Sequence, residues 1–151
     1  ALARGLGDVY KRQIGEHGAQ RYKEVFMPRV SLGFLRETAL SNGQPFHLIA
    51  WIPRGNTVIY GTNGEKCSPK FRRFFADKKE TAYCCHAEMQ AIEKARANSR
   101  DVLWVARFRK DGSLCISRPC HYCMTHIRRA GIKRIHYVDS DGNWVKEILN
   151  Y

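Results

Sequence analysis

Three side chains that bind transition metals and one carboxylate occur in two short motifs of the sequence. One residue separates His86 from Glu88, and two separate Cys120 from Cys123. Imidazole nitrogen and thiolate sulfur are common zinc ligands in proteins, and three of them leave the fourth tetrahedral position open for water. That arrangement is typical of catalytic zinc sites. The residue types therefore predict such a site, with Glu88 placed to move the protons of the water.

Both motifs lie where the sequence predicts the start of a helix. Residues 86–98 are rich in helix formers, and residues 119–130 begin with Pro and are followed by Gly131. Two cysteines at i and i+3 share one face of a helical turn, and the free N–H groups of a helix N-terminus stabilise thiolates. Cys120 and Cys123 can therefore bind the same ion.

The remaining pattern predicts an α/β fold, one sheet flanked by helices. Apolar residues with helical spacing cover residues 30–40 and end before Asn42-Gly43. Turn residues at 53–56 and 139–142 predict two hairpins. The segments with strand-like composition are 46–52, 57–60, 102–108, 114–117, 132–138 and 144–149.

Length and charge narrow the function classes. The chain has 151 residues, the length of one domain, and its 26 Lys and Arg against 14 Asp and Glu give a net charge of +12. Such a balance suits nucleic acid, nucleotides or an anionic surface, and a well-solvated surface is the alternative. The longest apolar run, 48–52, is far shorter than the roughly 20 residues that span a bilayer. We expect no membrane segment, no signal peptide, and a cytoplasmic, reducing location for the six cysteines.

The first 13 residues do not read as part of the domain. Residues 4–13, RGLGDVYKRQ, match the translation of the end of a transposase-based sequencing-library adapter. An ordinary basic tail is the alternative. Such scars are left out of fold reasoning, so the predicted domain covers residues 14–151.

H-x-E followed downstream by P-C-x-x-C is a signature of zinc-dependent nucleobase deaminases. On these residues the chain resembles the cytidine/deoxycytidylate deaminase superfamily, which includes tRNA adenosine deaminases and APOBEC-type editors of DNA and RNA. The resemblance covers roughly residues 46–151. It implies a three-layer α/β fold with one mixed sheet of about five strands, and Zn²⁺ held by His86, Cys120 and Cys123.

The resemblance also implies a hydrolytic mechanism and roles for further residues. Water activated by zinc attacks the carbon that bears the exocyclic amine, and Glu88 carries its proton to the ring nitrogen and then to the leaving ammonia. The Ala87 backbone N–H would contact the base carbonyl, and the Arg118 carbonyl would accept from the amine. Gly61-Thr62-Asn63 is similar to the family's G-x-N, in which Asn holds the sugar; a plain turn is the alternative.

Three features bear on the substrate. The His ligand resembles that of nucleotide, tRNA and nucleic-acid deaminases, because free-cytidine deaminases usually place Cys there. The turn at 139–142 predicts an antiparallel final hairpin, which resembles free-cytidine, blasticidin and some toxin deaminases more than the parallel ending of APOBEC proteins. APOBEC-type editors also carry Trp two residues before the Pro, where this chain has Ser117.

One predicted loop interleaves cations with aromatics, the mixture that single-strand binders use to stack bases and meet phosphates. Burial of two of its aromatic rings in the core, with the charges solvated, is the alternative. The candidate nucleic-acid-binding residues are Phe71, Arg72, Arg73 and Phe74.

Together these patterns predict that the chain deaminates cytosine to uracil in single-stranded DNA or RNA. A free dCMP or cytidine deaminase with an incidentally basic surface is the first alternative, and adenosine deamination in tRNA is the second. A third is a non-catalytic zinc or nucleic-acid-binding module, in which Cys85 closes the site as a fourth ligand.

Overall fold

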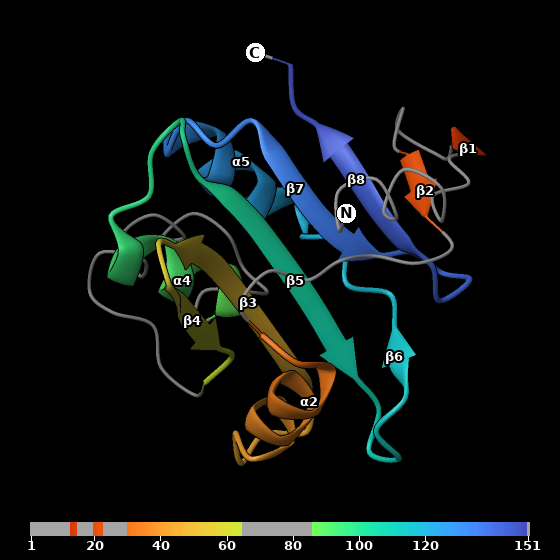
Figure 1. Ribbon diagram of the computed structural model, residues 1–151. Helices are drawn as coiled ribbons and strands as arrows, with labels where there is room; N and C mark the ends of the chain where they lie inside the picture. Colours follow the sequence, from red (N-terminus) through yellow and green to blue (C-terminus); the bar gives the residue numbers. More distant parts are fainter. Residues whose placement is uncertain (1–12, 15–19, 23–29, 65–85, 151) are drawn as a thin grey trace.

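The computed structural model describes residues 13–14, 20–22, 30–64 and 86–150 (Figure 1). The helices within these ranges have nine residues each: α2 (Leu32–Leu40), α4 (Ala87–Ala95) and α5 (His121–Arg129). Within these ranges no helix has the length and apolar character needed to cross a membrane. The strands are β1 (Gln13–Ile14), β2 (Gln20–Tyr22), β3 (His47–Arg54), β4 (Thr57–Thr62), β5 (Val102–Phe108), β6 (Leu114–Cys115), β7 (Arg134–Val138) and β8 (Trp144–Ile148).

All eight strands join one mixed sheet. Its order is β1-β2-β8-β7-β5-β3-β4, and β6 pairs with β5 beside this path. The β5–β7 pair is parallel, whereas every other pair is antiparallel. A parallel pair needs a crossover connection, and α5 lies in the segment that joins β5 to β7. Five strands have five or more residues and form the body of the sheet.

Side chains of the central strands point alternately to the two faces of the sheet, and each face carries a hydrophobic core. In β3, Ile49 and Trp51 pack with Leu35 of α2, whereas Ala50 and Ile52 pack in the cluster that contains α4 and α5. Figure 1 shows α2 in front of the sheet and the other two helices behind it. The protein is therefore a three-layer α/β fold, as predicted.

The first hairpin is tighter than predicted. The turn expected at 53–56 contains only Gly55 and Asn56, because β3 continues through Pro53 to Arg54. The last β3–β5 pair joins Trp51 to Trp104, so Pro53 lies beyond it and its missing N–H leaves no ladder hydrogen bond unmade. Gly55 has a φ of 53°, which glycine adopts without steric cost in a two-residue turn.

The final hairpin is antiparallel, as its Asp-Gly turn predicted. Val138 pairs with Trp144, and the Asp139 carboxylate accepts hydrogen bonds from the backbone N–H groups of Asp141 and Asn143. The short strands β1 and β2 were not predicted; β2 pairs with the outer edge of β8. Gln13, the last residue of the segment attributed to an adapter, pairs with Arg21, and residues 1–12 lie outside the described residues.

Candidate metal centre and pocket

The two helices behind the sheet begin side by side, and their first residues carry the predicted metal ligands. His86 is the N-cap of α4 and Cys120 is the N-cap of α5. N-caps favour Ser, Thr, Asp or Asn, whose side chains bond to the first N–H groups of the helix. Neither His86 nor Cys120 makes such a capping bond. Their side chains instead approach each other, with Cys120 Sγ 3.7 Å from His86 Nδ1.

The spacing of the three ligand atoms fits a zinc ion. His86 Nδ1 lies 3.1 Å from Cys123 Sγ, and the ligand atoms of His86, Cys120 and Cys123 all lie within 4.8 Å of one another. In a tetrahedral zinc site, bonds of about 2.0–2.1 Å to nitrogen and about 2.3 Å to sulfur place the two atoms about 3.6 Å apart. One imidazole and two thiols are also the donors that zinc prefers over magnesium or calcium. The site therefore fits a three-ligand zinc centre.

Without a cation, the two thiols share their protons unequally. Hydrogen bonding to Cys123 lowers the pKa of Cys120 to about 4, with a further contribution from His86. The same hydrogen bond to Cys120, together with burial, raises the pKa of Cys123 well above its usual range. Hydrogen bonding to Cys120 raises the pKa of His86. Because metals bind thiolate and neutral imidazole, binding a zinc ion here releases protons.

Glu88 lies in the first turn of α4 and is almost completely buried beside this cluster. Burial raises the pKa of its carboxyl, although its own backbone N–H and the neighbouring His86 act in the opposite direction. Burial thus disfavours the charged form of this carboxyl, which helps it to hold a proton as well as to accept one, as general acid–base catalysis requires. A helix start favours a carboxylate but burial opposes its charge, so a carboxyl buried beside these ligands indicates a functional site.

A pocket of about 430 Å³ opens next to the metal cluster, within the size range of small-molecule sites. It lies at the end of the sheet where α4 and α5 begin. Its walls come from the start of β3, the end of β5 and the segments that follow β4 and β6. The lining residues are Gln44, Pro45, Phe46, Leu48, Asn63, Gly64, His86, Ala87, Glu88, Arg107, Ile116, Ser117, Arg118 and Cys120.

The structure brings most of the predicted site residues together. Asn63, Ala87 and Arg118 line the pocket with Glu88, whereas Cys123 is fully buried behind it. As the first residue of α4, Ala87 has a backbone N–H with no partner inside the helix. The other predicted set, Phe71, Arg72, Arg73 and Phe74, lies outside the described residues, as does Cys85.

A hydrogen-bonded pair of asparagines, Asn42 and Asn63, fixes one wall. The Asn63 carboxamide oxygen accepts from the Leu48 backbone N–H at 2.9 Å and from Asn42 Nδ2 at 2.8 Å. Its own Nδ2 donates to the Phe46 carbonyl at 3.0 Å. Sequence reasoning treated Asn42 as a helix stop, and no sequence signal links residues 42 and 63. The link arises because α2 ends beside the start of β3.

Two further residues hold the wall that precedes Cys120. The Ser117 hydroxyl donates to the Val105 carbonyl and accepts from the Val138 N–H, both at 2.8 Å, so it bridges β5 and β7. Arg118 Nε and Nη2 donate to the two carboxylate oxygens of Glu147, each at 3.3 Å. The two residues that precede Pro119 are therefore anchored to the sheet. The sequence predicted neither side-chain contact, because both depend on strand pairing.

A comparison with protein families supports this geometry. A family model described as the cytidine and deoxycytidylate deaminase zinc-binding region matches residues 35–139, more than half of the chain. The matched segment contains all three metal-binding side chains and Glu88. A search of curated proteins finds no match.

Proposed function

Because the chain belongs to the cytidine and deoxycytidylate deaminase family, we propose that it is a zinc-dependent hydrolase that converts cytosine to uracil. The observation that carries the proposal is the convergence of His86, Cys120 and Cys123 within 4.8 Å, beside a buried carboxyl and an open pocket. These three side chains would hold the zinc. When bound, the ion would lower the pKa of a water molecule towards about 7 and so supply a nucleophile at neutral pH.

The proposed reaction also needs a residue that transfers protons, and Glu88 would take this role. Glu88 takes a proton from the attacking water and delivers it to the ring nitrogen next to the reacting carbon. The second water proton passes to the amino group, which leaves as ammonia, while the water oxygen becomes the new carbonyl. The reaction therefore consumes one water and needs no oxidant or reductant. The raised pKa of Glu88 matches its role as a proton carrier.

Backbone and amide groups would orient the base. The Ala87 N–H points from a helix start and is suited to the base carbonyl, and the Arg118 carbonyl is suited to the amine. The Asn63 oxygen already accepts two hydrogen bonds, so this side chain would meet a ligand through its second amide hydrogen. Asn63 is therefore proposed as a donor to the sugar.

For the substrate we propose cytosine in single-stranded DNA or RNA. A base inside a duplex cannot reach such a pocket, so the target must be unpaired or flipped out. The net charge of +12 supports a polyanionic substrate. The antiparallel β7–β8 pair favours a second candidate, a free dCMP or cytidine deaminase, because that ending resembles those enzymes.

A side-by-side assay tests the substrate. The zinc-loaded protein is incubated with single-stranded DNA, single-stranded RNA, dCMP, cytidine and an adenosine-containing tRNA anticodon loop, with the zinc-stripped protein as control. Mass spectrometry detects the gain of about one dalton when an amine becomes a carbonyl. We expect conversion of cytosine in an oligonucleotide. Conversion of dCMP or cytidine alone identifies the second candidate, and conversion of adenosine alone overturns both.

A further inference from the structure

Arg107 occupies a position on β5 where the alternation of the strand otherwise places core residues. Leu103 and Val105 point to the face covered by α4 and α5, and both are fully buried. Arg107 is the next residue on that face, and it pairs across the sheet with Leu48. The helices begin at this end of the sheet, so Arg107 reaches the pocket instead of the core. At this register position the chain therefore places a half-buried cation at the pocket.

The guanidinium of Arg107 contacts an aromatic ring. Its carbon lies 5.0 Å from the centroid of the Phe46 ring, a cation–π contact. In the described part of the chain, no carboxylate forms an ion pair with it. Two other arginines contrast with it, because Arg54 pairs with Asp101 at 2.7 Å and Arg118 pairs with Glu147 at 3.3 Å.

The guanidinium of Arg107 lines the pocket in which we propose that the substrate binds. Among the described lining residues Glu88 is the one acid, and its carboxyl is buried beside the metal ligands. A cation–π contact helps to hold a guanidinium in place and leaves its N–H groups available to meet an anion. Phe46 is 57% exposed, so Arg107 is presented at the mouth of the pocket. The arrangement suits a bidentate contact with a phosphate.

We propose that Arg107 binds a phosphate of the substrate, and that this contact makes the enzyme prefer phosphorylated substrates over nucleosides. The inference rests on the proposed function, because it places the base beside Glu88 and the phosphate at Arg107. The ligand class is the phosphate attached to a cytosine nucleoside. It is a monoester in a free nucleotide and a diester in a polynucleotide, and the two share this chemistry.

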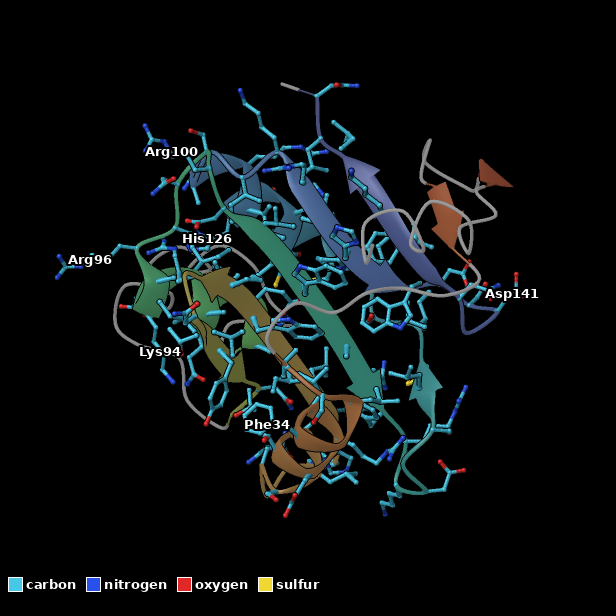
Figure 2. All side chains as sticks on the ribbon, in the orientation of Figure 1. Phe34, Lys94, Arg96, Arg100, His126 and Asp141 are labelled. Atoms are coloured by element: carbon cyan, nitrogen blue, oxygen red, sulfur yellow. The ribbon has the colours of Figure 1, made fainter. Side chains whose placement is uncertain are left out.

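Arg107→Gln tests the contact and Arg107→Lys tests its bidentate character, with Arg100→Gln as the matched control. Arg100 is exposed and precedes the first residue of β5, at the end of the strand opposite to Arg107. Its side chain points away from the body of the molecule (Figure 2). Its replacement removes the same charge without touching the pocket. For each variant, kcat/KM is measured with deoxycytidine, dCMP, a single-stranded oligonucleotide, and the same oligonucleotide with neutral methylphosphonates flanking the cytosine.

We expect Arg107→Gln to lower kcat/KM about 10- to 100-fold for phosphorylated substrates, the scale of a charge-assisted hydrogen bond, and less than about twofold for deoxycytidine. Arg107→Lys should recover part of the loss, and Arg100→Gln should behave as wild type. The loss confined to dCMP identifies a monoester site, and the loss confined to the oligonucleotide but absent with methylphosphonates identifies a diester site. An equal loss on all substrates, or no loss on any, overturns the proposal.

Calorimetric binding of CMP and cytidine to the zinc-loaded proteins separates this inference from the proposed function. If the wild type deaminates nothing but binds CMP more tightly than cytidine, and Arg107→Gln removes that difference, the phosphate contact stands while the proposed function fails. If CMP and cytidine bind equally to the wild type and the oligonucleotide shows no phosphate dependence, the phosphate contact fails while deamination stands or falls by its own assay.

Discussion

At the scale of single residues, the candidate metal ligands occupy helix positions where other side chains would form capping hydrogen bonds. His86 and Cys120 occupy N-cap positions but do not cap, and Glu88 is buried in the first turn of α4. The two N-cap residues forgo the capping bonds that serine, threonine, aspartate or asparagine would make, and burial opposes the ionised form of Glu88. Such departures from local preference are expected at functional sites.

Cys120→Ser tests this opposition between stability and metal binding. Serine is a favoured N-cap, so at about pH 4, where the lowered pKa of Cys120 no longer stabilises the folded wild type, we expect the metal-free variant to be more stable than the metal-free wild type by about 0.5–1 kcal/mol. The same change removes a thiolate ligand, so zinc should no longer bind stoichiometrically. Urea unfolding of the metal-free proteins and zinc content after reconstitution check the two halves. A variant that keeps one zinc per chain contradicts the assignment of Cys120.

At this scale the sequence was informative where chemistry depends on local spacing. His86, Glu88, Cys120 and Cys123 could be predicted because each pair lies within one turn of a helix start. Residues in the pocket, or supporting its walls, whose roles depend on strand pairing or on distant contacts could not be predicted, because no short-range pattern encodes those neighbours. These are Asn42, Arg107, Ser117 and Glu147.

At the scale of elements, the position of α4 depends on close contact with β4. A Cβ on Gly61 would lie 2.8 Å from both the Ala87 carbonyl oxygen and the Ala91 nitrogen. Only glycine lets the helix approach so closely. Because Glu88 lies in the first turn of that helix, the contact also sets how deep the Glu88 carboxyl lies in the pocket.

Gly61→Ala should therefore destabilise the protein by about 1–3 kcal/mol and reduce turnover, because the helix must move away from the sheet. Gly33→Ala is the matched control. Its Cβ would meet nothing closer than Ser31 Oγ at 3.9 Å, and it lies inside α2. Replacing a helical glycine with alanine should raise the free energy of unfolding by about 0.5–1 kcal/mol. Thermal unfolding and turnover are measured for both variants. Equal changes in stability and turnover in the two would contradict the proposed close contact between β4 and α4.

The other end of α4 is tied to the sheet by an ion pair between Arg54 and Asp101. Arg54 also donates to the Ala95 carbonyl at 2.9 Å, and the Asn98 N–H donates to Asp101 at 2.8 Å. Burial opposes ionisation of Asp101, but hydrogen bonds from Arg54 and Asn98 and the Arg54 charge outweigh it and lower its pKa. The pair therefore couples the stability of α4 to pH.

A carboxyl whose pKa is lowered by folding stabilises the protein above its unfolded pKa of about 3.9, and the contribution is lost as the pH falls through the folded value. Asp101→Asn should cost about 1–3 kcal/mol at pH 7, because Arg54 loses its partner. The difference between wild type and variant should shrink as the pH falls below about 4. Urea unfolding at pH 7, 4 and 3 measures it. A difference that is constant with pH would show that the charge of Asp101 contributes nothing.

The elements themselves were largely predictable, because apolar period and turn residues act locally. Strand β5 has the predicted bounds, and the helices begin within two residues of their predicted starts. The antiparallel ending followed from the Asp-Gly turn, where Gly142 has a φ of 82°. Strands β1 and β2 escaped prediction, since two or three residues carry no periodicity and pair only because β8 offers an edge.

At the scale of the whole molecule, the net charge of +12 makes substrate length a measurable variable. Binding a polynucleotide releases counterions in proportion to the phosphates contacted, whereas a mononucleotide contacts few. Raising the salt concentration from about 50 to 200 mM should therefore lower kcat/KM about tenfold or more for single-stranded DNA, and about twofold or less for dCMP. Steady-state rates at four salt concentrations give the dependence of log kcat/KM on log salt concentration for each substrate. Equal slopes for the two substrates would show that the positive charge does not contact the polynucleotide.

The central claim is that three side chains hold zinc while a fourth moves protons, and one pair of measurements on the same preparations tests it. Zinc content and ammonia release are measured for the wild type, Glu88→Ala and Glu93→Ala, the last an exposed acid on the same helix. We expect one zinc per chain in all three proteins, with turnover lower by about 10²–10⁴-fold or more in Glu88→Ala alone. Full turnover in Glu88→Ala with zinc bound would contradict the proposed mechanism.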